Sequence, residues 1–129
     1  MDADELEAKW DVQLRKGTLE LGVLAALQGR SLYGLELLAL LQDFATLAIT
    51  EGTLYPLMDR LRRDGLVDAR WEQQAETKPR KYYRLTTEGE ARLASQALRW
   101  RQAVGDIEQL LRHPGPGPLN PKGKRHGRT

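Results

Sequence analysis

Hydroxyl, phenol and guanidinium groups gather on one side of the stretch from Thr50 to Arg63, TEGTLYPLMDRLRR. Such groups are donors that contact base edges and phosphates in DNA. The apolar residues on the opposite side are Leu54, Leu57, Met58 and Leu61. Their spacings of three and four predict one buried face of a short helix. The polar face of this helix suits a DNA groove, and a solvated helix without a ligand is the alternative.

Pro56 limits where this helix can begin, because a proline deep in a helix removes a hydrogen bond and costs about 3 kcal/mol or more. A proline is tolerated in the first turn. We therefore expect regular helix from Gly52 or Thr53, with the hydroxyl of Thr50 or Thr53 as the cap. The first turn then exposes Thr53 and Tyr55. In helix-turn-helix proteins the N-terminal residues of the second helix reach the base edges.

A second group of donors lies in residues 78–84, which contain no acidic residue. The cations of this segment are Lys78, Arg80, Lys81 and Arg84. Cations on a projecting loop neutralise phosphates and release counterions, and the interleaved tyrosines donate to phosphate oxygens. The segment therefore predicts a DNA contact, and a plain solvated surface is the alternative.

The elements around these residues form a recognisable series. Residues 66–73 and 80–85 both alternate in polarity and are separated by a polar segment with a proline, which predicts a β-hairpin. Upstream, Ser31 is the expected cap of a leucine-rich helix that ends near Leu41, and residues 44–49 form a short turn. Two short helices joined by such a turn make a helix-turn-helix, and a hairpin directly after it is a wing.

Two amphipathic helices precede this unit. Residues 2–14 place Leu6, Trp10 and Leu14 on one face, and residues 16–28 predict a separate second helix. The first of these helices is expected to support a dimer. A tryptophan on a terminal helix most often packs against its own domain or against a partner subunit.

A long helix follows the wing, opened by a capping box of Thr87 and Glu90 and ending near residue 112. Its apolar residues recur with the rhythm of a coiled-coil seam: Leu93, Ala97, Trp100, Val104, Ile107 and Leu111. We expect this helix to pack against its twin in a homodimer. The alternative is a seam that packs within the monomer.

Composition argues against several function classes. The chain of 129 residues has 29% charged and 40% hydrophobic residues, and it contains no apolar run long enough for a membrane span. Its N-terminus is acidic, unlike that of a signal peptide. We therefore expect a cytoplasmic protein. It has no cysteine, and its two histidines, His113 and His126, lie near the C-terminus. We therefore expect no metal, no cofactor and no enzyme.

The net charge of +2 is a misleading average. Residues 113–129 are rich in proline, glycine and cations and predict a disordered basic tail. Residues 1–112 carry 16 basic and 18 acidic side chains, a net −2. The expected organisation is therefore a helix over 1–14, a DNA-binding domain over 15–86, a dimerisation helix over 87–112 and the tail, and a role in DNA binding depends on where the charges lie.

The chain resembles the PadR family of bacterial transcriptional regulators, in particular its shorter members with a single C-terminal dimerisation helix. The resemblance covers residues 13–111 and is carried by EGTLYP (51–56) and RKYYRLTTEG (80–89), with LRKGTLELGVLAAL, LYG and RLRRDGL in the same order. It implies a mainly α fold with a small β-hairpin, a winged helix-turn-helix that dimerises through its N- and C-terminal helices. It also implies repression at a double-stranded DNA operator with two half-sites, often relieved by a small molecule.

The resemblance also implies roles for individual residues. Tyr33 would touch the DNA backbone, Thr53 and Tyr55 would lie at the groove with Arg60 alongside, and the wing cations would bind phosphates. With the capping hydroxyl, the predicted DNA-binding residues are Tyr33, Thr50, Thr53, Tyr55, Arg60, Lys78, Arg80 and Lys81.

Two tryptophans are candidates for binding an effector. Some multidrug-responsive members of the family place a tryptophan on the last helix, where it stacks on planar compounds at the dimer interface. Trp100 lies on the predicted seam, and Trp10 is the expected neighbour. The alternative is that both pack the interface. A second function class, a winged module that binds a protein or sequesters a ligand without DNA, is suggested by the net −2.

Overall fold

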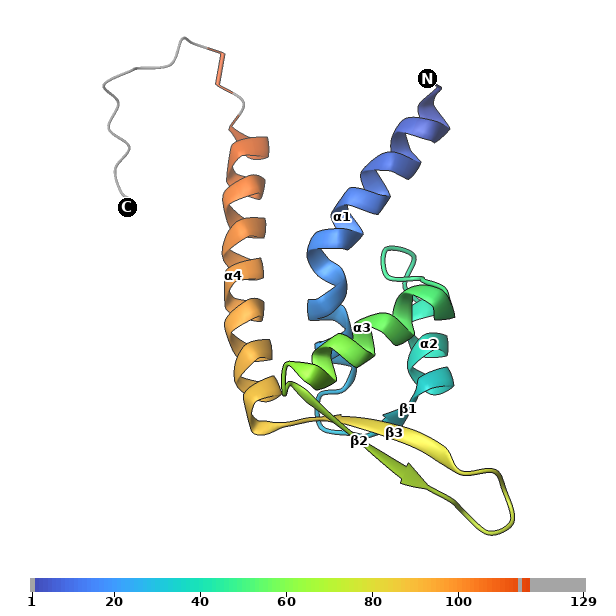
Figure 1. The fold of residues 1–129 in the computed structure, drawn as a ribbon. Helices are drawn as coiled ribbons and strands as arrows, with labels where there is room; N and C mark the ends of the chain where they lie inside the picture. Colours follow the sequence, from blue (N-terminus) through green and yellow to red (C-terminus); the bar gives the residue numbers. More distant parts are fainter. Residues whose placement is uncertain (1, 114, 117–129) are drawn as a thin grey trace. The chain divides into compact units, whose positions relative to one another are not determined.

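The computed structural model describes residues 2–113, 115 and 116 (Figure 1). Its elements are α1 (Ala3–Ala26), β1 (Leu32–Tyr33), α2 (Gly34–Gln42), α3 (Glu51–Arg63), β2 (Val67–Glu72), β3 (Arg80–Leu85) and α4 (Thr87–Arg112). They belong to two compact units, residues 1–97 and 98–129, and α4 begins in the first and ends in the second. The predicted mainly α fold with a hairpin is confirmed. Most of the predicted disordered tail lies outside the described residues.

Each of the described helices is too short or too polar to cross a membrane.

The sheet has three antiparallel strands in the order β1-β3-β2, so the hairpin's second strand is central. In the predicted hairpin, Val67 pairs with Leu85 and Glu72 pairs with Arg80. Figure 1 shows the tip of this hairpin projecting beyond the helices of the first unit. The wing is therefore a long ribbon that is anchored at one end only.

The prediction of a helix directly after Ser31 was wrong. Leu32 and Tyr33 form β1 and pair with β3. The carboxylate of Glu36 accepts a hydrogen bond from the backbone N–H of Tyr33 at 3.0 Å, so α2 begins at Gly34. Pairing with β3 gives the backbone of these two residues partners that a longer helix would not provide.

Helix α1 is continuous where the sequence predicts two helices. Asp2 and Glu5 form a capping box at its start, with bonds of 2.8 and 3.1 Å. Gly17 lies in its exposed middle. One glycine costs a helix only about 1 kcal/mol. That is too little to end a helix whose two halves are otherwise good helix formers.

Helix α3 begins at Glu51, slightly earlier than expected. Thr50 is in the N-cap position, but its hydroxyl does not accept the predicted capping hydrogen bond. Pro56 therefore lies in the second turn, where it leaves the carbonyl of Gly52 without its helical donor. Gly52 is exposed, so water can reach that carbonyl. The helix ends at Arg63, and the φ of +77° at Gly65 lets the N–H of Leu66 turn back to the carbonyl of Leu61.

The core lies where α1, α2, α3 and the sheet meet. Its fully buried residues are Val23, Leu24, Leu27, Leu37, Leu41, Leu54, Met58, Leu61 and Val67. Three of these come from the predicted apolar face of α3, and the fourth residue of that face, Leu57, is half-buried. Each large side chain contributes about 1.5–3 kcal/mol by leaving water. This packing holds α3 with its polar face outward.

Thr86, rather than the expected Thr87, caps α4. Its hydroxyl oxygen accepts a hydrogen bond from the N–H of Gly89 at 2.9 Å and donates to the carbonyl of Gly65 at 2.6 Å. The same side chain thus satisfies the helix end and ties it to the turn after α3. The next residue, Thr87, is exposed.

Candidate nucleic-acid interface

The start of α3 presents Thr50, Gly52 and Thr53 to solvent, and of these the sequence predicts Thr53 to be exposed in the first turn. Tyr55 is half-buried instead, because its ring lies against Gly34 at the start of α2. A Cβ on Gly34 would lie 2.6 Å from Cε1 of Tyr55. The glycine of the LYG motif therefore makes room for this ring. Burial, and the nearby carboxylate of Glu51, raise the pKa of Tyr55. Its hydroxyl, like that of an ordinary tyrosine, can donate a hydrogen bond at neutral pH.

One face of the wing carries a cation stacked on an aromatic ring. The guanidinium carbon of Arg80 lies 4.4 Å from the ring centroid of Tyr33, and Tyr33 meets Tyr82 edge-on with centroids 5.5 Å apart. The structure thus brings two of the predicted DNA-binding residues, Tyr33 and Arg80, into contact. Stacking does not neutralise the charge of Arg80, and the side chain is exposed, so its charge remains available to a phosphate.

The other face of the wing carries Lys81, since successive side chains of a strand point to opposite faces. Its ammonium group lies 5.8 Å from the ring centroid of buried Tyr83. Trp71 is directly opposite Lys81 in the β2–β3 register and is 67% exposed. The structure therefore adds an indole to the wing surface, and Lys78 lies exposed in the segment leading into β3.

Sequence reasoning did not single out Trp71. Alternation along β2 places it on the same side as Val67, which is buried, and suggests a packed residue. The hairpin extends beyond the core, however. This side of the hairpin is therefore buried near Val67 and exposed near Trp71. A large aromatic residue near the turn of an otherwise polar hairpin was the available signal.

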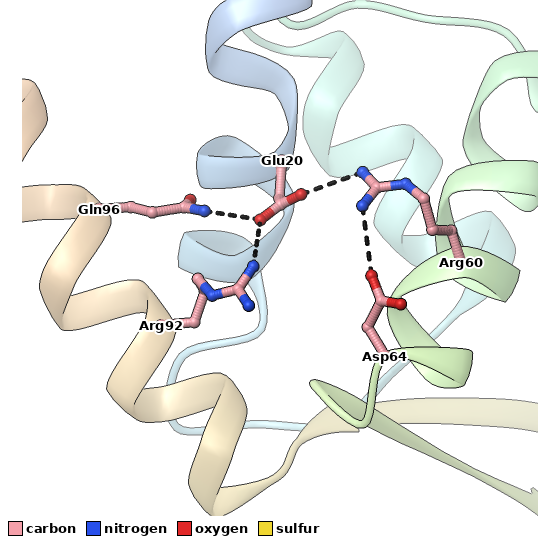
Figure 2. A network of polar contacts seen from close by, with 5 residues as sticks. All are labelled: Glu20, Arg60, Asp64, Arg92 and Gln96. Carbon is pink, nitrogen blue, oxygen red and sulfur yellow. Dashed lines mark hydrogen bonds and ion pairs between the residues drawn. The ribbon is translucent and has the colours of Figure 1, made fainter.

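Arg60 is engaged by carboxylates rather than free on the reading surface. Its guanidinium contacts Glu20 of α1 at 3.0 Å and Asp64 at 3.5 Å (Figure 2). Glu20 also accepts hydrogen bonds from Gln96 at 2.6 Å and Arg92 at 3.4 Å. Among the predicted DNA-binding residues, Arg60 is thus the one that faces α1 and the start of α4.

The environment of Glu20 has opposing effects on its acidity. Burial raises the pKa of its carboxyl, but hydrogen bonds from Gln96 and Arg60 and the charges of Arg60 and Arg92 outweigh burial and lower the pKa. A carboxyl whose pKa is lower in the folded state stabilises the fold above its unfolded pKa. This stabilisation is lost as the pH falls through the folded value.

We therefore expect Glu20→Gln to lower the stability at neutral pH and to weaken the loss of stability as the pH falls below about 5. Urea unfolding midpoints over this range measure the effect. Glu7→Gln changes an exposed carboxyl on the same helix and should follow the parent. An acid dependence of Glu20→Gln equal to that of the parent would contradict the assignment.

The residues predicted for a dimer interface differ in their surroundings. Leu93 is 8% exposed and belongs to the core of the first unit, and Ala97 is half-buried. Exposed in the second unit are Leu98, Trp100, Val104, Ile107, Leu110 and Leu111. A partner subunit could therefore contact the exposed apolar residues that follow Ala97, whereas Leu93 is almost inaccessible.

The two tryptophans predicted to bind an effector are both exposed, Trp10 on α1 and Trp100 on α4. They belong to different units, so a shared site stays a prediction. The described part of the chain contains no group of three or more histidine, cysteine, aspartate or glutamate residues placed to hold a metal ion.

Comparison with known proteins agrees with this geometry. The model of the transcriptional regulator PadR-like family matches residues 23–95, from the end of α1 through the wing to the start of α4. Curated proteins include no match to the chain.

Solved structures of regulators have the same fold. A PadR family transcriptional regulator from Eggerthella lenta is 36% identical with a TM-score of 0.75, and the alignment covers 85% of this chain and 96% of that one. A PadR-like transcription factor from Bacteroides fragilis is 33% identical with a TM-score of 0.65, covering 79% and 98%. A PadR-like regulator from Bacillus cereus is 28% identical with a TM-score of 0.71, covering 77% and 96%. The chain belongs to the PadR-like family of transcriptional regulators.

Proposed function

We propose that the protein is a homodimeric repressor that binds a two-half-site DNA operator and is released by a planar aromatic effector. The observation that supports this most is the pairing, in one unit, of an exposed first turn of α3 with a projecting cationic wing. The first supplies donors for base edges and the second supplies charge for phosphates. Membership in a family of transcriptional regulators supports the same function.

Charge placement fits this proposal better than net charge does. The net −2 of residues 1–112 disfavours indiscriminate binding to DNA. Positive side chains on the wing, Lys78, Arg80 and Lys81, face solvent at least in part. We propose that they hold the phosphate backbone while Thr50, Thr53 and the hydroxyl of Tyr55 face the groove.

Apolar surface on the outer helices supports a twofold dimer. Leu6 and Trp10 of α1, and Trp100, Val104 and Ile107 of α4, are large apolar residues left exposed by the monomer. A twofold dimer would bury this surface and present two copies of α3 to two half-sites. An effector that stacks on Trp100 or Trp10 would change the spacing of the two α3 helices and so release the operator.

Lys81→Ala is expected to weaken binding to every duplex by a similar factor, because a phosphate contact carries no sequence information. Losing one such contact should reduce the slope of log K against log salt by about 0.9. Fluorescence anisotropy of a labelled duplex at several salt concentrations measures both. Lys16→Ala, at an exposed position on α1, is the matched control and should leave the slope unchanged. An unchanged slope for Lys81→Ala would remove this residue from the interface.

Thr53→Ala is expected to act differently, by altering which base pair is preferred at one position of each half-site. A contact to a base edge contributes about 1–3 kcal/mol of discrimination. Competition between the parent's preferred duplex and its single-base variants measures this change, and the salt slope should stay that of the parent. Thr87→Ala, also exposed, serves as the control. If Thr53→Ala ranks the duplexes as the parent does, Thr53 does not read a base.

A further inference from the structure

One carboxylate, Glu20, joins three helices of the first unit. Figure 2 shows Arg60 from α3 and Arg92 and Gln96 from α4 converging on Glu20 of α1. The shortest contact, at 2.6 Å, comes from the side-chain amide of Gln96, and Arg60 contacts the other carboxylate oxygen at 3.0 Å. Both carboxylate oxygens are thus occupied, one by α3 and one by α4.

We call Glu20 and its three partners, Arg60, Arg92 and Gln96, the joint, because their contacts fix α3 and the start of α4 to α1. The side chain of Glu20 is only 21% exposed, so its charge depends on these donors more than a surface carboxylate would. Arg60 is held at two points, because its second terminal nitrogen lies 3.5 Å from Asp64 at the end of its own helix. The contact with Asp64 fixes the planar guanidinium relative to α3 itself, so its contact with Glu20 restricts the rotation of α3 about its axis.

The rotation of α3 matters for its exposed first turn. Thr53 and Arg60 are seven residues apart, which places them on nearly the same side of the helix about 10 Å apart along its axis. A short helix packed on a core moves as a rigid body. Any roll permitted at Arg60 therefore displaces Thr53 sideways.

We propose that Glu20 is a positioning residue that locks the roll of α3 to the start of α4, and that Arg60 serves this joint instead of a DNA phosphate. The part that concerns DNA rests on the proposed function. Because α4 continues without a break to Arg112, the joint also gives events on that helix a route to the reading surface. Coupling then passes through Gln96 and Glu20 to α3.

The first test measures the joint without DNA. Gln96→Ala removes a neutral donor and no charge, and amide hydrogen exchange is followed by peptide. Exchange in residues 57–63 of α3 should become roughly fivefold faster, while exchange in α2 stays at the parent rate. Ser95→Ala, an exposed neighbour on α4, is the control and should change neither. Unchanged exchange in α3, or an equal rise in α2 and α3, would overturn the proposed joint.

The second test measures the effect on reading, with the duplex that the parent prefers and a scrambled duplex of equal length. In fully folded protein, Gln96→Ala should lower affinity for the preferred duplex roughly fivefold and leave scrambled binding and the salt slope unchanged. Arg60→Ala should lower the affinity for the preferred duplex. The slope of log K against log salt should stay equal to that of the parent.

A slope reduced by about 0.9 in Arg60→Ala would show that Arg60 contacts a phosphate, and would overturn its assignment to the joint. If Gln96→Ala binds the preferred duplex as tightly as the parent does, the Glu20 contacts do not affect the recognition of bases by α3. If the parent discriminates between no duplexes, the proposed function fails, and hydrogen exchange alone decides whether Glu20 positions α3.

Discussion

Replacing Gly89 with alanine is expected to destabilise the first unit by about 3 kcal/mol or more, at the upper end of the cost of overpacking. A Cβ at this position would overlap the carbonyl oxygen of Leu66 and lie 3.0 Å from its carbonyl carbon. The oxygen is not free to move, because it accepts a hydrogen bond from the N–H of Thr86 at 3.1 Å. The close approach of α4 to the turn before β2 thus requires glycine.

Urea unfolding at neutral pH measures the loss, and Gly17→Ala is the matched control. Gly17 is a helical glycine with no atom within 4 Å of an added Cβ, so alanine there should stabilise the protein by up to about 1 kcal/mol. The two substitutions are chemically identical and should have opposite signs. A Gly89→Ala variant as stable as the parent would show that α4 does not lie against Leu66.

Ile107→Asp is expected to turn the dimer into a monomer and to weaken operator binding at least about 100-fold, because linked half-sites gain that much or more from simultaneous engagement. Ile107 is 58% exposed in the chain and lies on the proposed seam, so a carboxylate there harms association and not the fold of the monomer. Sedimentation gives the oligomeric state, and anisotropy gives the affinity.

Gln102→Asp is the control for this prediction. It adds the same charge to the same exposed helix on the side away from Trp100 and Val104, so dimer and operator binding should persist. If Ile107→Asp stays dimeric, α4 does not form the seam. If it becomes monomeric and still binds the operator as tightly as the parent, the two-half-site model is wrong.

Local patterns predicted much of the fold. The apolar face of α3 follows from residue spacing alone, and the hairpin follows from alternation on both sides of a polar turn. Gly65 ends α3 as expected because only a positive φ fits there. These features depend on neighbours along the chain, so the sequence shows them directly.

Features that depend on distant residues were harder to predict. A two-residue strand such as β1 has no periodicity, and its existence depends on pairing with β3, about 50 residues away. Arg60 lies on the polar face of α3, as a DNA-binding residue would. Its actual partner, Glu20, comes from a different helix. The exposure of Trp71 likewise depends on how far the ribbon extends beyond the core.

The most direct test of the central claim is selection of bound duplexes from a random DNA pool by the purified protein at moderate salt. A sequence-specific dimer should enrich two related half-sites in inverted orientation with one fixed spacing, because a twofold protein imposes its symmetry on its site. The enriched sequence would also serve as the probe for Thr53→Ala and Gln96→Ala. No enrichment by folded, dimeric protein would contradict the claim and favour a winged module that binds a protein or a ligand instead.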